Sequence, residues 1–200
     1  MIDLAPALKK YTEERDKPNE VGRYSCSQIY SYLNGWCSPT DFLKGEEKDF
    51  AQCFRMWQGT SKHKQVEDLM KVIGYETEVK KEMKVEPITI VGIADYLSDG
   101  EVADLKTSME LYKVAKKWHL YQVKLYCTLF EKPIGKIVQP VYKTKSVFKR
   151  GKTKLEPDKF YLKELGSVKR DDKWFNEQMD LLLKFHNKIL KVVKSLKPKL

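Results

Sequence analysis

The chain has 200 residues, of which 42% are hydrophobic and 12% aromatic, which is enough to bury the core of one domain. No apolar run approaches the roughly 20 residues that a membrane-spanning helix needs. Residues 1–10 also contain no long apolar stretch of the signal-peptide kind. This composition excludes global disorder and predicts a soluble intracellular protein that does not interact with a membrane.

The net charge of +10 is spread unevenly along the chain. The first hundred residues hold 14 Lys and Arg against 17 Asp and Glu, and the second hundred hold 24 against 11. A basic half is typical of a protein whose partner is rich in phosphate, although a lysine-rich solvated surface has the same composition. The four cysteines, Cys26, Cys37, Cys53 and Cys127, form no CxxC pair, so we expect reduced and mostly buried thiols rather than a zinc site.

The N-terminal half begins with a polar segment, residues 1–24, that we expect to be a loosely held arm. Ser25 or Ser27 can cap a short helix that ends near Gly35. A second helical stretch is predicted over residues 46–73, with a break near Gly59.

Three strands follow, at residues 77–86, 88–95 and 101–107, as an antiparallel meander with a turn at residues 98–100. A helix is expected over residues 108–130, then a strand over 135–142 and an edge strand at 160–162. Residues 143–154, with six basic residues and no acid, predict a loop or flexible hairpin. An amphipathic helix begins at Asp171 or Asp172. This order predicts a mixed α/β fold with a small central sheet: a core over residues 25–170, with the helix 171–200 packed on it.

Asp104-Leu105-Lys106 places a carboxylate and an ammonium on one face of a strand, so both could attend one phosphate. The chain contains five such acid-x-Lys triplets, so the tripeptide is weak evidence alone. Its context is stronger, because Asp95 ends the preceding strand of the hairpin and can approach Asp104. Two neighbouring carboxylates repel unless a cation joins them, and their oxygens suit Mg²⁺ or Mn²⁺. The alternative is that Asp95 caps a turn and Asp104 pairs with Lys106 on the surface.

His63 and Glu67 are four residues apart and share a helical face, as do Gln122 and Tyr126 on the later helix. A single histidine on a helix is more often a surface or core residue than a ligand. Gln122 and Tyr126 could equally be packing residues.

Taken together, these segments resemble the RecB-like nucleases, the exonuclease branch of the PD-(D/E)XK phosphodiesterase superfamily, in order and spacing over residues 25–142. The matching segments are Gly59-Thr60-Ser61-Lys62-His63, Gly92-Ile93-Ala94-Asp95, Asp104-Leu105-Lys106-Thr107-Ser108, and Gln122 with Tyr126. Some members hold an iron–sulfur cluster with three cysteines near the C-terminus. No cysteine follows Cys127 here, so we expect no such cluster.

The resemblance implies a restriction-endonuclease-like core and a metal-dependent deoxyribonuclease, an exonuclease acting on single strands or on ends. It implies that His63, Asp95, Asp104 and the carbonyl of Leu105 ligate Mg²⁺ or Mn²⁺. Catalysis would involve Lys106 besides the two aspartates, with Gln122 and Tyr126 positioning the strand. Glu67 and Glu82 are candidates for a further ligand.

We expect DNA contacts from the basic segment, which should lie beside the mouth of the cleft. Its basic residues are Lys143, Lys145, Lys149, Arg150, Lys152 and Lys154. The aromatic candidates for stacking on unpaired bases are Trp36, Trp57, Tyr142 and Phe148, although aromatic residues more often pack in a core.

Two alternatives stay open: a non-catalytic nucleic-acid-binding or assembly protein on the same fold, and a sequence-specific endonuclease. The resemblance is also compatible with a homo-oligomer or with recombination and defence partners, and with the cytoplasm of a prokaryotic cell or a virus-encoded protein in its host.

Overall fold

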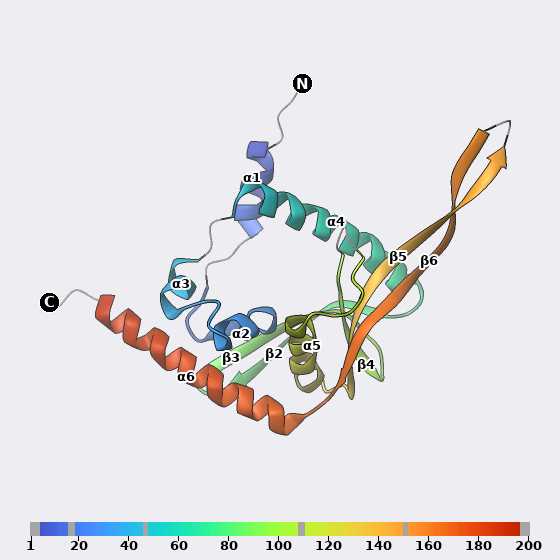
Figure 1. Ribbon diagram of the computed structural model, residues 1–200. Helices are drawn as coiled ribbons and strands as arrows, with labels where there is room; N and C mark the ends of the chain where they lie inside the picture. The colour runs from blue at the N-terminus through green and yellow to red at the C-terminus, as the bar shows by residue number, and fades with distance from the viewer. Residues whose placement is uncertain (1–4, 16–18, 46–47, 108–110, 150–151, 197–200) are drawn as a thin grey trace.

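The computed structural model describes residues 5–15, 19–45, 48–107, 111–149 and 152–196, with the backbone alone at residues 13–15, 149 and 152 (Figure 1). Helices and strands are mixed along the chain, as the sequence predicts. The elements are α1 (Ala5–Arg15), β1 (Arg23–Ser25), α2 (Cys26–Leu33), α3 (Pro39–Lys44), α4 (Phe50–Val72), β2 (Glu76–Val85), β3 (Ile88–Leu97), β4 (Glu101–Leu105), α5 (Lys117–Leu129), β5 (Ile134–Lys149), β6 (Lys152–Lys169) and α6 (Asp172–Leu196).

The sheet is organised around β3. One edge of β3 pairs with β2 along its whole length, in antiparallel register from Ile88 to Leu97. The other edge is divided between two strands: β1 pairs in parallel with residues 89–91, and β4 pairs antiparallel with residues 96 and 97. The sheet then continues through β5, parallel to β4, to β6. Residues 92–95 of β3 therefore lie between the two pairings, where β1 and β4 diverge.

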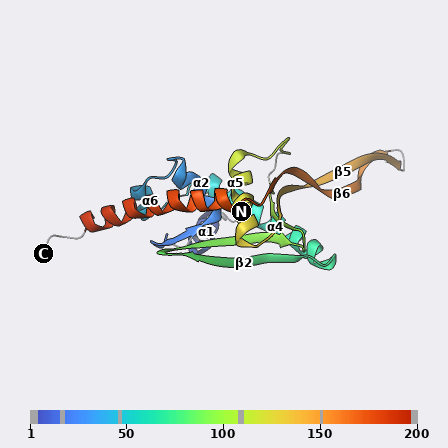
Figure 2. The same cartoon turned by 90° about the horizontal axis from the view of Figure 1, so that it is seen from below.

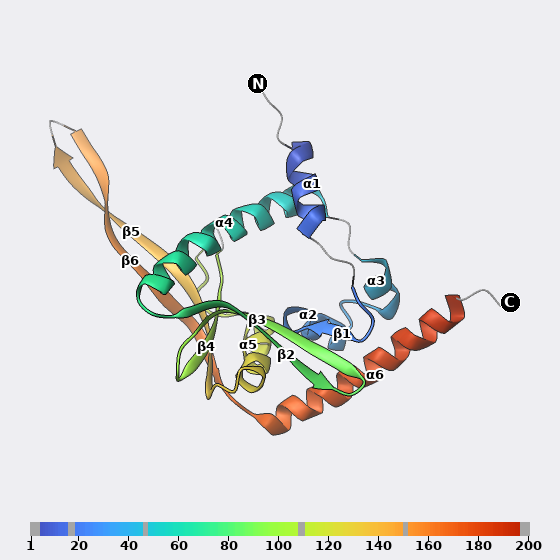
Figure 3. The same ribbon diagram turned by 180° about the vertical axis from the view of Figure 1, so that it is seen from behind.

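The two faces of the sheet are covered by different helices. Along β4, Val102 belongs to the core beneath α2, α5 and α6, whereas Ala103 and Leu105 belong to a second core beneath the C-terminal half of α4. Figure 2 shows α2, α5 and α6 together on one side of β2 and β3, and Figure 3 shows the sheet from behind. Because successive strand residues alternate faces, Asp104 points to the same side as Val102, toward α5.

Helix α5 packs against β3 at van der Waals distance because residue 92 is glycine. A Cβ atom on Gly92 would lie 2.5 Å from Leu129 Cδ2 and 3.0 Å from Tyr126 Cε1. This close approach brings the polar side chains of α5 within hydrogen-bond reach of the strands.

The three strands of the meander and the last helix are confirmed as elements. In α6, Phe175, Met179, Leu182 and Ile189 are buried at helical spacing, and Asp171 accepts a hydrogen bond from the Trp174 backbone N–H. Hydrophobic periodicity was sufficient for β2 and α6, because each has one face more buried than the other.

Two expectations for the N-terminal half were wrong. Residues 5–15 of the expected arm form α1, which packs against the N-terminal half of α4 (Figure 1). Helix α4 is continuous through Gly59 and begins only after a capping box between Asp49 and Gln52. Between these helices, Pro39 is the first residue of α3 and follows the capping residue Ser38.

The helix expected over residues 108–130 begins at Lys117 instead, and residues 108–110 lie outside the description. Residues 111–116 are irregular because residues of β5 and β6 accept hydrogen bonds from their backbone N–H groups. The Tyr112 N–H donates to Gln139 Oε1 at 2.9 Å, and the Ala115 N–H donates to the Leu165 carbonyl at 3.0 Å. Helical periodicity in the sequence cannot show these long-range hydrogen bonds.

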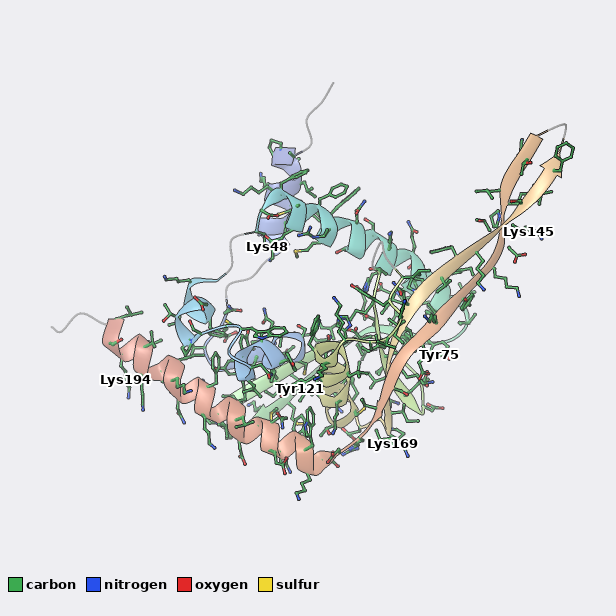
Figure 4. All side chains as sticks on the ribbon, viewed as in Figure 1. Lys48, Tyr75, Tyr121, Lys145, Lys169 and Lys194 are labelled. Atoms are coloured by element: carbon green, nitrogen blue, oxygen red, sulfur yellow. The ribbon has the colours of Figure 1, made fainter. Side chains whose placement is uncertain are left out.

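Of the two forms predicted for the basic segment, the described residues form the hairpin and not the loop. Strands β5 and β6 continue as a paired two-stranded ribbon to Lys149 and Lys152. From here on, the arm means residues 142–160 of this ribbon and not the N-terminal segment 1–24. Figure 4 shows Lys145 on the arm, well away from Tyr121 on α5 and at the opposite end of the molecule from Lys194 on α6. Among the described residues, no helix is long and apolar enough to cross a membrane.

Candidate active site

Two adjoining cavities meet where β3 and β4 diverge beneath α4. The first has a volume of about 770 Å³ and is lined by His63, Asp95 and residues of β4 and α5. The second, of about 670 Å³, lies between α1, α4, β2 and β3. Both contain Gly59, His63, Ile93 and Asp95 in their walls, so the His63–Asp95 pair separates the cavities.

Asp95 lies in the segment of β3, residues 92–95, that pairs with neither β1 nor β4. Its Oδ2 accepts a hydrogen bond from the Leu105 backbone N–H, which connects the ends of β3 and β4. Its Oδ1 lies 3.6 Å from His63 Nδ1. The alternative that Asp95 caps a turn is wrong, because the residue is inside β3 and faces a histidine of α4.

His63, Glu67 and Asp95 can each offer a ligand atom, and these atoms lie within 4.8 Å of one another. Glu67 is 3% exposed, and its Oε2 has no hydrogen-bond partner among the described residues. A buried carboxylate oxygen without a partner is energetically costly unless a cation or water satisfies it. A nitrogen and two carboxylates therefore fit a divalent cation, with oxygen donors preferred by Mg²⁺ and the imidazole favouring Mn²⁺.

A second group of side chains lies beside this cluster, in the first cavity. Asp104 is 5% exposed, and its Oδ2 forms an ion pair with Lys106 Nζ at 2.6 Å. Gln122 Nε2 donates to Asp104 Oδ1 and to the Tyr126 hydroxyl, each at 2.8 Å. The Tyr126 hydroxyl in turn donates to the Ile93 carbonyl at 2.8 Å. This network fixes the Asp104 side chain against α5. Its last acceptor, the Ile93 carbonyl, belongs to residues 92–95 of β3, which lie between the pairings with β1 and β4.

The electrostatics of the site favour added positive charge. Burial raises the pKa of Asp104 despite the neighbouring Lys106, and the charge of Asp95 raises it further. Burial, Glu78 and Asp95 raise the pKa of Glu67. For His63, burial lowers the pKa, but Asp95, Asp104 and Glu67 together outweigh burial and raise it. All three shifts favour proton uptake, as expected where several acidic groups share a poorly solvated space.

Most of the residues singled out from the sequence lie together. His63, Asp95, Asp104, Leu105, Lys106, Gln122 and Tyr126 all line the first cavity, and Glu67 lines the second. Glu82 does not join them: its carboxylate is bonded to Arg23 and Lys80 and belongs to neither cavity. These ion pairs lower the pKa of Glu82 to about 2. Glu82 is therefore removed from the candidate ligands.

The placement of the basic segment beside the cleft mouth was also wrong. The described residues of the arm line neither cavity, because the ribbon projects beyond the body of the sheet (Figure 1). The side chains of Lys143, Lys145 and Lys154 are exposed. Those of Lys149 and Lys152, and the whole of Arg150, lie outside the described structure.

Several residues of the first cavity were missed in the sequence. Arg55, Gln58 and Lys62 precede His63 on α4 and line the cavity with it. Their spacing was a usable signal, because these three residues are three and four positions apart and share a helix face with one another. Ser25 and Ser27 reach the cavity through the pairing of β1 with β3, and no local pattern indicates that contact.

No family model matches the chain, and no curated protein matches it. Solved structures do share its fold. An alkaline exonuclease from Laribacter hongkongensis superposes with a TM-score of 0.60 at 14% identity, over 90% of this chain and 93% of that one. A structure of that exonuclease in complex with dAMP gives a TM-score of 0.59 at 14% identity, with the same two coverages. A phage-related exonuclease from Haemophilus somnus 129PT gives 0.56 at 14% identity, over 88% and 96%.

At these identities the similarity establishes the fold. The chain is a mixed α/β protein whose six-stranded sheet and flanking helices are arranged as in these exonuclease structures. The fold expected from the RecB-like resemblance is therefore confirmed, and the function has to be argued from the site.

Proposed function

We propose that this protein is a divalent-metal-dependent DNA nuclease that hydrolyses phosphodiester bonds, acting as an exonuclease. The observation that carries the proposal is the buried Glu67 carboxylate, whose Oε2 has no hydrogen-bond partner among the described residues, beside His63 and Asp95 and next to the Asp104–Lys106 pair. The exonuclease structures of the same fold support it.

His63, Asp95 and Glu67 would hold the cation, with Asp104 and the Leu105 carbonyl as the ligands that the family resemblance adds. A divalent cation in such a site lowers the pKa of a bound water and polarises the scissile phosphate. The protein would bind Mg²⁺ or Mn²⁺, and the histidine nitrogen favours Mn²⁺.

The side chains around the cation have separate tasks in this mechanism. Lys106 donates to the phosphate oxygen on which negative charge develops and orients the attacking water. Gln122 holds Asp104, and through the Tyr126 hydroxyl it connects α5 to the β3 carbonyl. The ammonium of Lys106 lies 3.5 Å from Gln122 Oε1, so the amide also restrains the lysine.

DNA is the proposed substrate because the walls of the first cavity contain positively charged side chains that can bind phosphates. Arg55 and Lys62 on α4 join Lys106 in its walls. Such groups bind the phosphodiester backbone without selecting a sequence. The lysines of the arm would add sequence-independent affinity for flanking DNA.

A cleavage assay tests the proposal. Linear and covalently closed circular DNA are incubated with the protein in Mn²⁺, in Mg²⁺ and in EDTA. We expect loss of linear DNA from its ends in either metal, with no cleavage in EDTA and none of the circle. Cleavage of the circle at fixed positions would instead identify a sequence-specific endonuclease, and binding without cleavage a non-catalytic protein.

Substitution of the ligands gives the decisive control. Asp104→Asn and Asp95→Asn should each lower the rate by about 10³-fold or more, because each removes a charge on which metal binding depends. His63→Ala should weaken metal affinity and be partly rescued by high Mn²⁺. Asp99→Asn, in the exposed turn between β3 and β4, is the matched variant and should behave as wild type. Wild-type cleavage by Asp104→Asn would contradict the proposal.

A further inference from the structure

A third cavity lies at the N-terminal end of α4, away from the metal ligands. It has a volume of about 550 Å³ and is formed between α1 and α4. Its walls are almost entirely apolar: Ala5, Ala7, Leu8 and Tyr11 from α1, and Phe50, Phe54 and Trp57 from α4. The described residues thus form an apolar groove on a protein whose second half is strongly basic.

The aromatic residues of α4 form an ordered ladder. Phe50, Phe54 and Trp57 follow one another at helical spacing, and their ring centroids are 6.1 Å and 6.0 Å apart, with interplanar angles of 24° and 32°. Each ring keeps a large exposed fraction, namely 55%, 38% and 44%. Core aromatics are buried, whereas these three side chains keep exposed surface against which a planar group could pack.

The groove adjoins the second cavity, which in turn adjoins the first cavity of the proposed active site. Tyr11 belongs to the walls of both the third and the second cavity. The second cavity in turn shares His63 and Asp95 with the first. The three cavities therefore follow α4 from Phe50 to His63, a distance of about 20 Å along the helix axis.

Positive charge on the same helix lies in the wall of the first cavity, whereas the second cavity has Lys64 among Glu67, Glu78 and Asp95. Arg55 follows Phe54 directly and lines the first cavity, and Lys62 lines it one residue before His63. Aromatic faces beside cations are the combination that binds single-stranded nucleic acid, since bases stack on the rings while phosphates contact the charges. A groove that bound a protein partner would not need to lie beside the proposed phosphate-binding and metal-binding residues.

We propose that the groove between α1 and α4 binds unpaired nucleotides of the substrate, whose bases stack on Phe54 and Trp57 while the strand passes along α4 to the His63–Asp95 cluster. Paired bases in a duplex do not expose their faces, so the occupant is single-stranded DNA or a frayed end. The inference rests on the proposed nuclease function for the identity of the substrate, and it assigns a substrate class and a surface to that function.

Binding in EDTA tests the groove separately from cleavage. The probes are a labelled oligothymidylate of about 12 nucleotides and a labelled blunt duplex. The groove variant is Phe54→Leu with Trp57→Leu, which keeps apolar volume but removes the aromatic faces. We expect its affinity for the oligothymidylate to fall by about 10-fold or more, with duplex affinity changed less than twofold. The matched variant Trp118→Leu removes an exposed tryptophan at the start of α5, outside the three cavities, and should leave both affinities unchanged.

Further measurements separate the other outcomes. Thermal unfolding within a degree of wild type would show that the groove variant is folded; a folding failure would be bypassed with Trp57→Phe, which retains a ring and should retain binding. Unchanged oligothymidylate affinity, or equal losses for both probes, would overturn the inference. A changed oligomeric state in sedimentation with unchanged DNA binding would overturn it in favour of a protein interface. If the wild-type protein cut no DNA yet lost oligothymidylate binding in the groove variant, the proposed catalysis would fail while the groove assignment held.

Discussion

Asp104, Lys106 and Gln122 hold one another inside a cavity, whereas Lys143, Lys145 and Lys154 extend from a two-stranded ribbon into solvent. In the cavity, the low dielectric constant strengthens the interaction of each charge with its neighbours. The ion pair and the hydrogen bonds fix the positions of these side chains. On the arm, water and salt screen each charge, including that of Lys145 in its exposed ion pair with Asp158 at 3.5 Å. Substitutions in the cavity should therefore act through geometry, and substitutions on the arm through salt-dependent affinity.

Among the variants that compare these two regions, the largest effect is expected at Lys106. Lys106→Ala should lower kcat by about 10²–10³-fold, because a positioned cation at a developing phosphate charge contributes on that order. DNA affinity in EDTA should stay within about threefold. Single-turnover cleavage and equilibrium binding measure the two quantities separately.

Lys81→Ala is the matched lysine variant, since Lys81 forms an ion pair with Glu131 outside the cavities. We expect wild-type turnover from it. Weakened binding with unchanged turnover in Lys106→Ala would show that this lysine acts like those of the arm, and the comparison between the two regions would fail.

A smaller effect is expected at Gly92, where the cavity region depends on close packing. Gly92→Ala should destabilise the fold by about 1–3 kcal/mol, because the added methyl group overlaps Leu129 and Tyr126. For a chain of this size that corresponds to a Tm lower by about 2–4 °C per kcal/mol. Cleavage should also slow, since displacement of α5 moves Gln122 away from Asp104.

Gly100→Ala serves as the control for Gly92→Ala, because nothing lies within 4 Å of the added Cβ at that turn position. Its Tm and activity should match wild type. Equal Tm values for the two alanine variants would show that α5 can move away from β3 without cost, and that the site is less tightly packed than described.

The smallest effect at physiological salt is expected on the arm. Changing Lys143, Lys145 and Lys154 together to alanine should flatten the dependence of log affinity on log salt. Each lost phosphate contact accounts for about 0.7–0.9 in slope, so the total is about 2 if most of the three touch DNA. The apparent KM should rise more than kcat falls.

The triple variant Lys184→Ala, Lys188→Ala and Lys191→Ala removes the same charge from the exposed face of α6, at the other end of the molecule. A binding titration over a salt series compares both triple variants with wild type. An equal change in slope for the two would mean that the arm contributes only net charge, and no change for the arm variant would exclude it from DNA binding.

The residues expected to form the site lie together where neighbours along the chain are also neighbours in space. Asp95 and Asp104 come together because one tight turn joins their strands, and Gln122 and Tyr126 share a face because they are four residues apart on α5. The expectation failed for Glu82, whose alternating strand pattern carries no information about Arg23, a partner 59 residues away.

The sequence by itself determined the period of each regular element, the turn between β3 and β4, and the types of side chain available for metal and phosphate chemistry. Only the tertiary structure decided where β1 and β4 divide the edge of β3, which opens the site at Asp95. It also decided where α5 begins, which end of the sheet carries the arm, and that α1 packs on α4 to form an aromatic groove. The reason is physical: periodicity and capping depend on residues within a few positions, whereas strand partners, buried hydrogen bonds and cavities depend on contacts between distant segments.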